Sequence, residues 1–304
     1  MDTLESLRQK LEEAQEIKSV VRTMKAVAAS NIGQYELAVS SLGDYFRTIA
    51  LGIIAYFRQE NIEGIYQQIE TKRNEDKLTY VVVFGSDQGL VGQFNDSLTE
   101  FVSKSLKEIP GKIEIWAVGE RIQLLLEDMG YNTSKLFSVP NSVNAITPLV
   151  QNILVKSEES FDQGNTNEVY IFHNQPKSGA GYEAVMQRLL PLDGDWRQTL
   201  TIQKWPTNKI PQVIGGKRPT LMALIHAYLF ASLFKACAES LNSENASRLA
   251  AMQRAEKNIE ELLDDISHKF NSMRQSSIDE ELFDVVSGFE ALKVDKIKKI
   301  SGSM

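Results

Sequence analysis

The fold is decided by the stretch Ala238–Phe270, which reads AESLNSENASRLAAMQRAEKNIEELLDDISHKF. It lies in a segment from about Pro219 to Leu292 that has no internal proline and no glycine before Gly288. Along it the spacing alternates between three and four residues, close to the 3.5-residue period of a coiled-coil seam. The seam positions are Ala238, Leu241, Asn245, Leu249, Met252, Ala255, Ile259, Leu262, Ile266, Phe270 and Met273. A helix of this length extends roughly 110 Å, so we expect it to need a partner helix and, over part of its length, another protein.

The first fifty residues have the same period, and Asp2 or Thr3 is placed to cap the helix that they predict. Their seam positions are Leu4, Leu7, Leu11, Ala14, Ile17, Val21, Met24, Ala28, Ile32, Tyr35, Val39, Leu42, Phe46, Ile49 and Ile53. The simplest pairing is an antiparallel two-helix coiled coil made from both termini. Because the two helices differ in length, part of the longer one stays unpaired. This overhang holds Phe283, Val285, Val286, Phe289 and Leu292, an apolar helix end that indicates an interaction site.

The middle of the chain alternates between apolar, β-rich runs and helical patterns. We expect strands at 78–84, 113–118, 135–139, 169–173 and, at an edge, 182–192, with helices at 97–108, 120–129 and 145–161. This order predicts a small Rossmann-like α/β domain with a mainly parallel sheet. The expected fold class is therefore α/β, with the long antiparallel coiled coil flanking that domain. The expected domains are a discontinuous shaft (1–57 and 219–304), the α/β domain (75–192) with a polar linker at 71–77, and a connecting loop (193–218).

Composition limits the possible partners. The net charge is −7 and the isoelectric point near 5.2, which disfavours nucleic acid and anionic lipid as main partners. The single cysteine, Cys237, excludes an internal disulfide and suits a reducing compartment. We find no run of eighteen apolar residues and no signal-peptide pattern at the N-terminus, so we expect no membrane-spanning segment and a location on the cytosolic side of a membrane.

Candidate chemistry is sparse. The loop Gly85–Gly92 follows a strand and precedes a helix, but it lacks the Gly-Lys-Ser/Thr ending of a phosphate loop, so we interpret its glycines as turn residues. The histidines His173, His226 and His268 have no metal-ligand spacing, and Cys237 lies on the seam-bearing helix as a small core residue. The acidic residues Glu260, Glu261, Asp264 and Asp265 are expected to form a solvated helix face. We predict no catalytic residue, cofactor or metal site.

Three motifs resemble the γ subunit family of F-type ATP synthases. Met24–Ser30 (MKAVAAS) is similar to the family's Met-x-Met-Val-Ala-Ala-Ser, and Ser86–Asn95 (SDQGLVGQFN) to its Ser-Asp-Arg-Gly-Leu-Cys-Gly-Gly-Phe-Asn loop. The longest match runs from Ala238 through Met252 and resumes at Arg274–Ile278, Glu281–Leu282 and Val286–Gly288. Asn31, Gln88 and Asp279 depart from the family's usual Lys, Arg and Thr, and Lys293–Lys299 extends past its usual end. These departures resemble a less common, alternate ion-translocating branch.

The resemblance implies a non-catalytic rotor in the central stalk. Its coiled coil would turn inside a ring of α and β subunits, and its α/β domain would rest on the membrane c-ring and an ε subunit, at the cytoplasmic face of a bacterial cell membrane. Family positions that contact the α/β ring match Met24, Arg248, Arg274, Gln275 and Glu281. We add Phe283, Val286 and Phe289 from the overhang. Neither the resemblance nor the residues tell whether protons or sodium ions drive the complex.

Two other interpretations stay open from the residues alone. One is a nucleotide-type α/β enzyme whose helices serve to dimerise it, although the absence of a phosphate motif disfavours it. The other is a coiled coil that tethers a membrane, which the acidic net charge disfavours.

Overall fold

The computed structural model describes residues 3–59, 78–162, 166–177, 181–191, 209 and 216–301. The predicted linker at 71–77 and most of the predicted loop at 193–218 lie outside these residues. Contacts divide the chain into two compact units: Met1–Lys25 with Met252–Met304, and Ala26–Ala251. This division passes through both long helices. The predicted domain boundaries therefore stay a prediction.

Both long helices are present. Helix α1 spans Leu4–Gln59 and helix α7 spans Lys217–Ser301, longer at its C-terminal end than the sequence pattern indicated. Thr3 caps α1 as expected: its Oγ1 accepts a hydrogen bond from the Ser6 backbone N–H at 3.2 Å, and the Ser6 Oγ accepts one from the Thr3 N–H at 3.3 Å. This reciprocal pair satisfies two donors at the helix start.

The larger unit contains a five-stranded sheet in the order β3-β2-β1-β4-β5. The strands are β1 (Leu78–Phe84), β2 (Lys112–Val118), β3 (Thr133–Phe137), β4 (Thr166–Pro176) and β5 (Tyr182–Leu190). All neighbours run parallel except β4 and β5, which are antiparallel. The predicted edge strand at 182–192 is confirmed as β5. The third strand was placed two residues too late, at 135–139, because Thr133 and Ser134 give it a polar start that hides it from a hydrophobic pattern.

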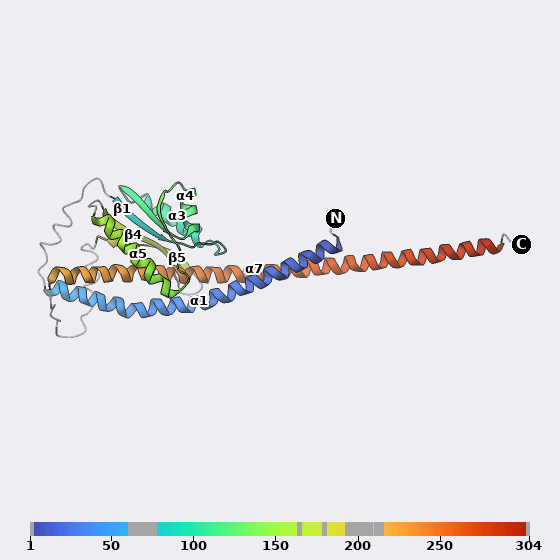
Figure 1. Ribbon diagram of the computed structural model, residues 1–304, viewed down its shortest axis with the longest axis horizontal. Coiled ribbons are helices and arrows are strands. Elements are labelled where there is room, and N and C mark those ends of the chain that lie inside the picture. The colour runs from blue at the N-terminus through green and yellow to red at the C-terminus, as the bar shows by residue number, and fades with distance from the viewer. Residues whose placement is uncertain are drawn as a thin grey trace. The chain divides into compact units, whose positions relative to one another are not determined.

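Three helices connect the strands: α3 (Phe94–Leu106), α4 (Glu120–Asp128) and α5 (Val143–Asp162). Figure 1 shows α3 and α4 over one face of the sheet and α5 over the other, beside α7. One core layer packs Val81, Val83 and Phe172 against α3 and α4. The other packs Tyr80, Val82 and Trp116 against α5 and α7. The predicted α/β domain with a mainly parallel sheet is confirmed, and α7 supplies part of the layer that covers one face.

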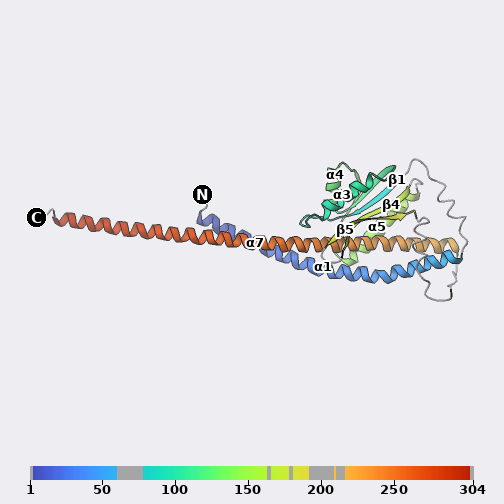
Figure 2. The same cartoon turned by 180° about the vertical axis from the view of Figure 1, so that it is seen from behind.

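In the same unit α1 and α7 lie side by side, as Figure 2 shows from behind. Ile49, Ile53 and Ile54 of α1 pack with Tyr228 and Ala231 of α7 in a separate apolar cluster. Further along, Tyr35 of α1 joins the core beneath the sheet. The two helices run antiparallel here, since later residues of α1 meet earlier residues of α7.

In the smaller unit the seam differs from the expected one at two positions. Ile17 is 55% exposed, and the neighbouring Lys18 lies inward and binds Glu260. Leu262 is 50% exposed, and Leu263 lies in the seam. Both predictions were wrong because they departed from a strict 3.5-residue period, which passes through polar Lys18 on α1 and through Leu263 on α7. Apolar residues consequently remain on the outer face.

Two described helices, Leu4–Tyr56 and Pro219–Gly288, contain an 18-residue window long and apolar enough to cross a membrane by length and composition. The windows are 22% and 39% buried within the structure. Core helices of water-soluble proteins pass the same test, and α1 and α7 bury an apolar cluster between them. The expected absence of a membrane-spanning segment stays a prediction.

Candidate functional site: the loop after the first strand and its joint with helix α7

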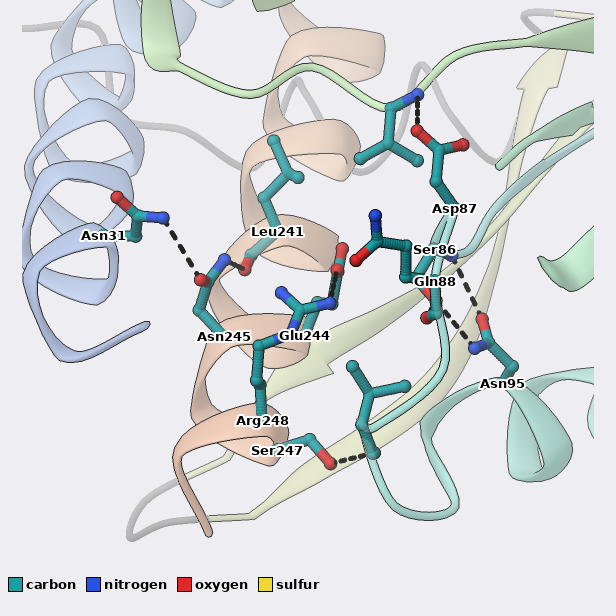
Figure 3. Close-up of polar contacts among 12 residues, drawn as sticks. Asn31, Ser86, Asp87, Gln88, Asn95, Leu241, Glu244, Asn245, Ser247 and Arg248 are labelled. Atoms are coloured by element: carbon teal, nitrogen blue, oxygen red, sulfur yellow. Dashed lines mark hydrogen bonds and ion pairs between the residues drawn. The ribbon is translucent and has the colours of Figure 1, made fainter. Parts of the chain in front are cut away.

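The loop after β1 is held by side chains that bond to backbone groups (Figure 3). The Asn95 side chain accepts a hydrogen bond from the Ser86 N–H at 3.0 Å and donates one to the Ser86 Oγ at 2.7 Å. The Asp87 carboxylate accepts from the backbone N–H of Glu120, at 3.1 Å, and from that of Val139, at 3.0 Å. Asp87 therefore ties the loop both to the start of α4, where a helix favours an anion, and to the chain after β3.

Two glycines allow the close approach of these segments. A Cβ on Gly85 would lie 2.3 Å from the Cβ of Ile122, a fully buried residue of α4. Gly119 has a φ of +118°, and a Cβ there would lie 2.5 Å from the Ser86 carbonyl oxygen. The expectation that the glycines of this region serve a tight strand-to-helix turn agrees with this geometry, although sequence reasoning missed Gly119.

Helix α7 presents a polar face to the same edge of the sheet. Ser240, Ser243 and Ser247 recur at spacings of three and four, which places them on one side of the helix. Their hydroxyls donate to the carbonyl oxygens of Phe84 (2.9 Å), Asn174 (3.0 Å) and Val91 (2.5 Å) respectively. All three serines are at least nine-tenths buried. We call these three serines the serine face of α7.

Charged groups at this joint are buried and paired. Glu239 of α7 lies 2.9 Å from the Nε2 of His173 on β4, and both residues are buried. One turn further, Arg248 donates to Glu244 at 2.6 Å. Burial raises the pKa of Glu244 above its usual range, and the Arg248 guanidinium opposes that rise. Burial also raises the pKa of Tyr35, on the facing helix α1, to about 12.

A polar contact lies in the helix seam of the larger unit, where the Asn31 side chain donates to that of Asn245 at 3.3 Å. Asn245 in turn donates to the Leu241 carbonyl oxygen at 2.8 Å (Figure 3). A polar pair at one seam position fixes the register of two helices, because a shift would leave both amides unpaired in an apolar environment. The Cys237 thiol lies buried nearby in the core, as expected, and burial raises its pKa.

The smaller unit has an ion-pair cluster of its own, formed by Lys18, Arg22 and Lys25 of α1 with Glu256 and Glu260 of α7. Arg22 Nε lies 2.7 Å from Glu256, and Lys25 binds the other oxygen of the same carboxylate. These hydrogen bonds lower the pKa of Glu256 to about 2. Glu260 is 48% exposed, in agreement with the expected solvated helix face, and it also pairs with α1. Glu261, Asp264 and Asp265 are exposed on α7.

None of these arrangements is a metal site. Within residues 3–59, 78–162, 166–177, 181–191, 209 and 216–301, no three or more His, Cys, Asp or Glu side chains gather so that they could hold a metal ion. His173 bonds to Glu239, and His268 is exposed on α7. Most of the named side chains at the joint bond to one another or to backbone carbonyls, although His173 Nδ1, Asn174 Oδ1 and Glu244 Oε2 are buried without a hydrogen-bond partner among the described residues. These bonds connect the helix to the sheet mechanically.

Comparison with protein families decides the identity. The family model described as ATP synthase matches residues 3–292, nearly the whole chain. The chain belongs to this family. It is the gamma, central-stalk subunit of an F-type ATP synthase and is not catalytic.

Similar proteins agree along the full length. The gamma chain of Histophilus somni is 25% identical over 291 residues, covering 94% of this chain and 98% of the relative. That of Caldicellulosiruptor saccharolyticus is 26% identical, with the same coverage of 94% and 98%. Among solved structures, the fold resembles a chain in the rotor of the Euglena gracilis mitochondrial ATP synthase, with a TM-score of 0.60, 17% identity and coverage of 90% and 98%. It also resembles a chain in the central stalk of the Tetrahymena thermophila enzyme, with a TM-score of 0.51, 18% identity and coverage of 78% and 99%.

The gamma-family positions predicted to contact partner subunits are distributed over both units. In the smaller unit, Met24 is half-buried on α1, while Arg274, Gln275 and Glu281 are exposed on α7. Phe283 is 73% and Val286 is 51% exposed. The side chain of Phe289 lies outside the described residues. Arg248, in the larger unit, is 18% exposed and bound to Glu244.

Sequence reasoning missed the serine face and Glu239. The available signal was the run from Glu239 to Ser247, where polar residues fill nearly every turn of a helix whose flanks are apolar. Such a run looks solvated, and it becomes a buried joint only when a second polar surface covers it.

Proposed function

We propose that this gamma chain couples ion flow to ATP synthesis or hydrolysis by turning its C-terminal helix inside a ring of α and β subunits. The observation that carries the proposal is the exposed apolar end of α7. Ile278, Leu282, Phe283, Val285 and Val286 are each more than half exposed. Exposed apolar residues gathered on one helix end mark an interaction surface.

The position of this surface supports a ring around it. In the smaller unit, ion pairs join α1 residues 18–25 to Glu256 and Glu260 of α7 in an antiparallel register. Because α1 begins at Leu4, the same register leaves the part of α7 beyond about residue 274 without an α1 partner. This single helix must be buried by other subunits and must still be able to turn, and a ring of subunits around it meets both requirements.

Polar residues near that surface would shift the populations of the catalytic states of the surrounding ring. Arg274, Gln275 and Glu281 are exposed on α7 and can bond to a ring subunit in one orientation and lose that bond in the next. A contact made in only some orientations shifts the populations of catalytic states by its differential free energy. We therefore assign these three residues, with Met24, Arg248, Phe283, Val286 and Phe289, as contacts with the α and β subunits.

The α/β domain would connect this shaft to the membrane part of the complex. We propose that it rests on the membrane c-ring together with an ε subunit, and that the complex lies at the cytoplasmic face of a bacterial cell membrane as a peripheral assembly. The acidic net charge of −7 favours protein partners over direct lipid binding.

Covalent crosslinking tests the proposal in the assembled complex. In a Cys237→Ser background, Glu281→Cys paired with a cysteine on a β subunit should abolish ATP hydrolysis on oxidation, and reduction should restore it. Lys257, exposed on α7 away from the helix tip, gives a second position where the helix cannot swivel past the crosslink. Lys112→Cys, exposed at the start of β2 and paired with the c-ring, is the matched control and should leave coupled hydrolysis intact. Unchanged turnover with a verified Lys257→Cys crosslink would exclude rotation.

A further inference from the structure

The sheet of this chain has the edge at which α/β domains bind their ligands. In open parallel sheets the binding crevice lies outside the carboxyl ends of the strands, where the strand order reverses. Here β1 connects to β2 on one side while β4 lies on the other, so the reversal falls between β1 and β4. The residues that end these strands are Phe84 and, near the end of β4, His173 and Asn174.

Helix α7 of the same chain occupies this crevice. Ser240 bonds to the Phe84 carbonyl at the end of β1, and Ser243 bonds to the Asn174 carbonyl on β4. Glu239 reaches His173 between them, and Ser247 bonds to Val91 in the following loop. Figure 3 shows α7 passing beside the loop that leaves β1. The carbonyl oxygens of Phe84, Asn174 and Val91, which a ligand would otherwise meet there, are bonded to the helix.

We infer that this serine face is the joint that transmits torque between the α/β domain and α7. The inference rests on the proposed rotary function, since a joint carries torque only if the domain and the shaft are driven from different ends. Ser240, Ser243 and Ser247 are positioning residues: they hold the shaft helix at a fixed rotation and height on the domain.

The kind of contact explains why these residues, rather than the apolar packing, resist the load. Apolar contacts are non-directional and proportional to area, so they oppose separation of two elements more than sliding of one along the other. A hydrogen bond weakens steeply when its angle falls below about 120°, so a small slip or rotation of α7 breaks it. The three bonds reach β1, β4 and the loop, which are three separate attachment points.

The rest of the joint is built to keep those attachment points still. The Asn174 side chain donates to the Phe94 carbonyl at 3.0 Å, which fixes the end of β4 to the start of α3. Asn95 and Asp87 hold the loop through Ser86, Glu120 and Val139. The serines therefore bond to backbone that is itself immobilised by other bonds.

The test is a triple variant, Ser240→Ala, Ser243→Ala and Ser247→Ala, assembled into the complex and reconstituted in vesicles. Each lost hydrogen bond should raise the population of the slipped joint roughly five-fold, so three together give about a hundred-fold. We expect ATP hydrolysis without an ion gradient to stay at the wild-type rate. Ion transport per ATP against a gradient should fall by roughly half or more, because the loaded joint slips.

A matched control replaces three exposed serines of α1, Ser19, Ser40 and Ser41, by alanine and should change neither quantity. If the serine-face triple variant transports as many ions per ATP as the wild type, the inference is overturned. A fall of hydrolysis and transport in the same proportion would also overturn it, because that result indicates a general structural defect. If the triple variant does not assemble, the three single variants are measured by the same two readouts, with the same criteria. Failure of the wild-type complex to transport ions at all would instead count against the proposed function.

Discussion

Substituting alanine for four glycines of the α/β domain separates two physical effects, steric overlap and the strain of a positive φ. At Gly85 a Cβ would overlap three atoms of Ile122 at 2.3, 2.5 and 2.9 Å, with no positive φ. At Gly130 the φ is +87° and no atom lies within 4 Å. Gly119 combines a φ of +118° with overlap at the Ser86 carbonyl, and Gly89 has neither.

The expected losses in the free energy of unfolding follow from these distances. Gly89→Ala should change it by no more than about 0.5 kcal/mol, as at an ordinary surface site. Gly130→Ala should lower it by about 1–2 kcal/mol, the cost of a left-handed conformation. Gly85→Ala should lower it by about 1–3 kcal/mol through overpacking against a buried helix. Gly119→Ala should lose about 2–5 kcal/mol, because both costs apply and a backbone carbonyl cannot rotate away as a side chain can.

Urea unfolding at low protein concentration measures these differences. Trp116 is fully buried in the α/β domain, and its fluorescence reports unfolding of that domain in a background with Trp196→Phe and Trp205→Phe. Alanine restricts the unfolded chain equally in all four variants, so that contribution cancels in the comparison. If Gly85→Ala unfolds at the same urea concentration as Gly89→Ala, the close packing of the loop on α4 is refuted.

Four further outcomes are expected. Glu256→Gln should lower the melting temperature of the helix pair at neutral pH, and the difference should disappear as the pH falls from 4.5 towards about 2, because Lys25 and Arg22 stabilise the charged carboxylate; circular dichroism measures it. In the wild type, burial favours the protonated Glu244, so this residue should stabilise the fold below pH 4.5 and stabilise it less as the pH rises. Glu244→Gln should lose this pH-dependent part of the free energy of unfolding, which urea titrations at several pH values measure. Reversing the charge of Arg274 or Glu281 should reduce coupling in vesicles while stability changes by less than ~1 kcal/mol. The isolated chain should aggregate, and co-expression with α and β subunits should relieve it, as size-exclusion chromatography would report.

The Glu256 prediction has a control variant in the chain, and each of the other three has an outcome that would contradict it. Glu261→Gln removes an exposed ion pair on the same helix and should not shift the melting curve at any pH. A pH-independent difference between Glu244→Gln and the wild type would contradict the burial of an acid there. Equal losses of melting temperature and coupling at Arg274 would mean that it stabilises the fold. A monodisperse isolated chain of high thermal stability would show that the apolar end of α7 needs no partner.

Much of the fold could be predicted because it depends on local patterns. The 3.5-residue period gave both long helices, and the apolar run Leu78–Phe84 gave the central strand with its exact limits. The pattern failed where polar residues replace apolar ones inside an element, as at Lys18 in the seam and Thr133 at the start of β3. Binary patterns cannot show whether a polar side chain is solvated or paired.

The candidate site was predictable only in part. The loop Gly85–Gly92 and the positions matching partner contacts followed from motifs, whereas the buried pair of His173 with Glu239 did not. Its members lie 66 positions apart, and neither has a neighbour in sequence that reveals the other. The sequence predicted that His173 lies on a strand as a structural residue, and the structure identifies its partner as Glu239.

The sequence by itself therefore determined that this chain makes two long helices around a small α/β domain, because periodicity is a property of neighbouring residues. Only the tertiary structure decided that α7 fills the crevice at the end of β1 and β4. Ser240 and Phe84, which form that contact, lie 156 positions apart. Their pairing depends on how the sheet and the helix pack as whole elements. A buried hydroxyl is stable only with a partner, and the fold, rather than the local sequence, supplies that partner.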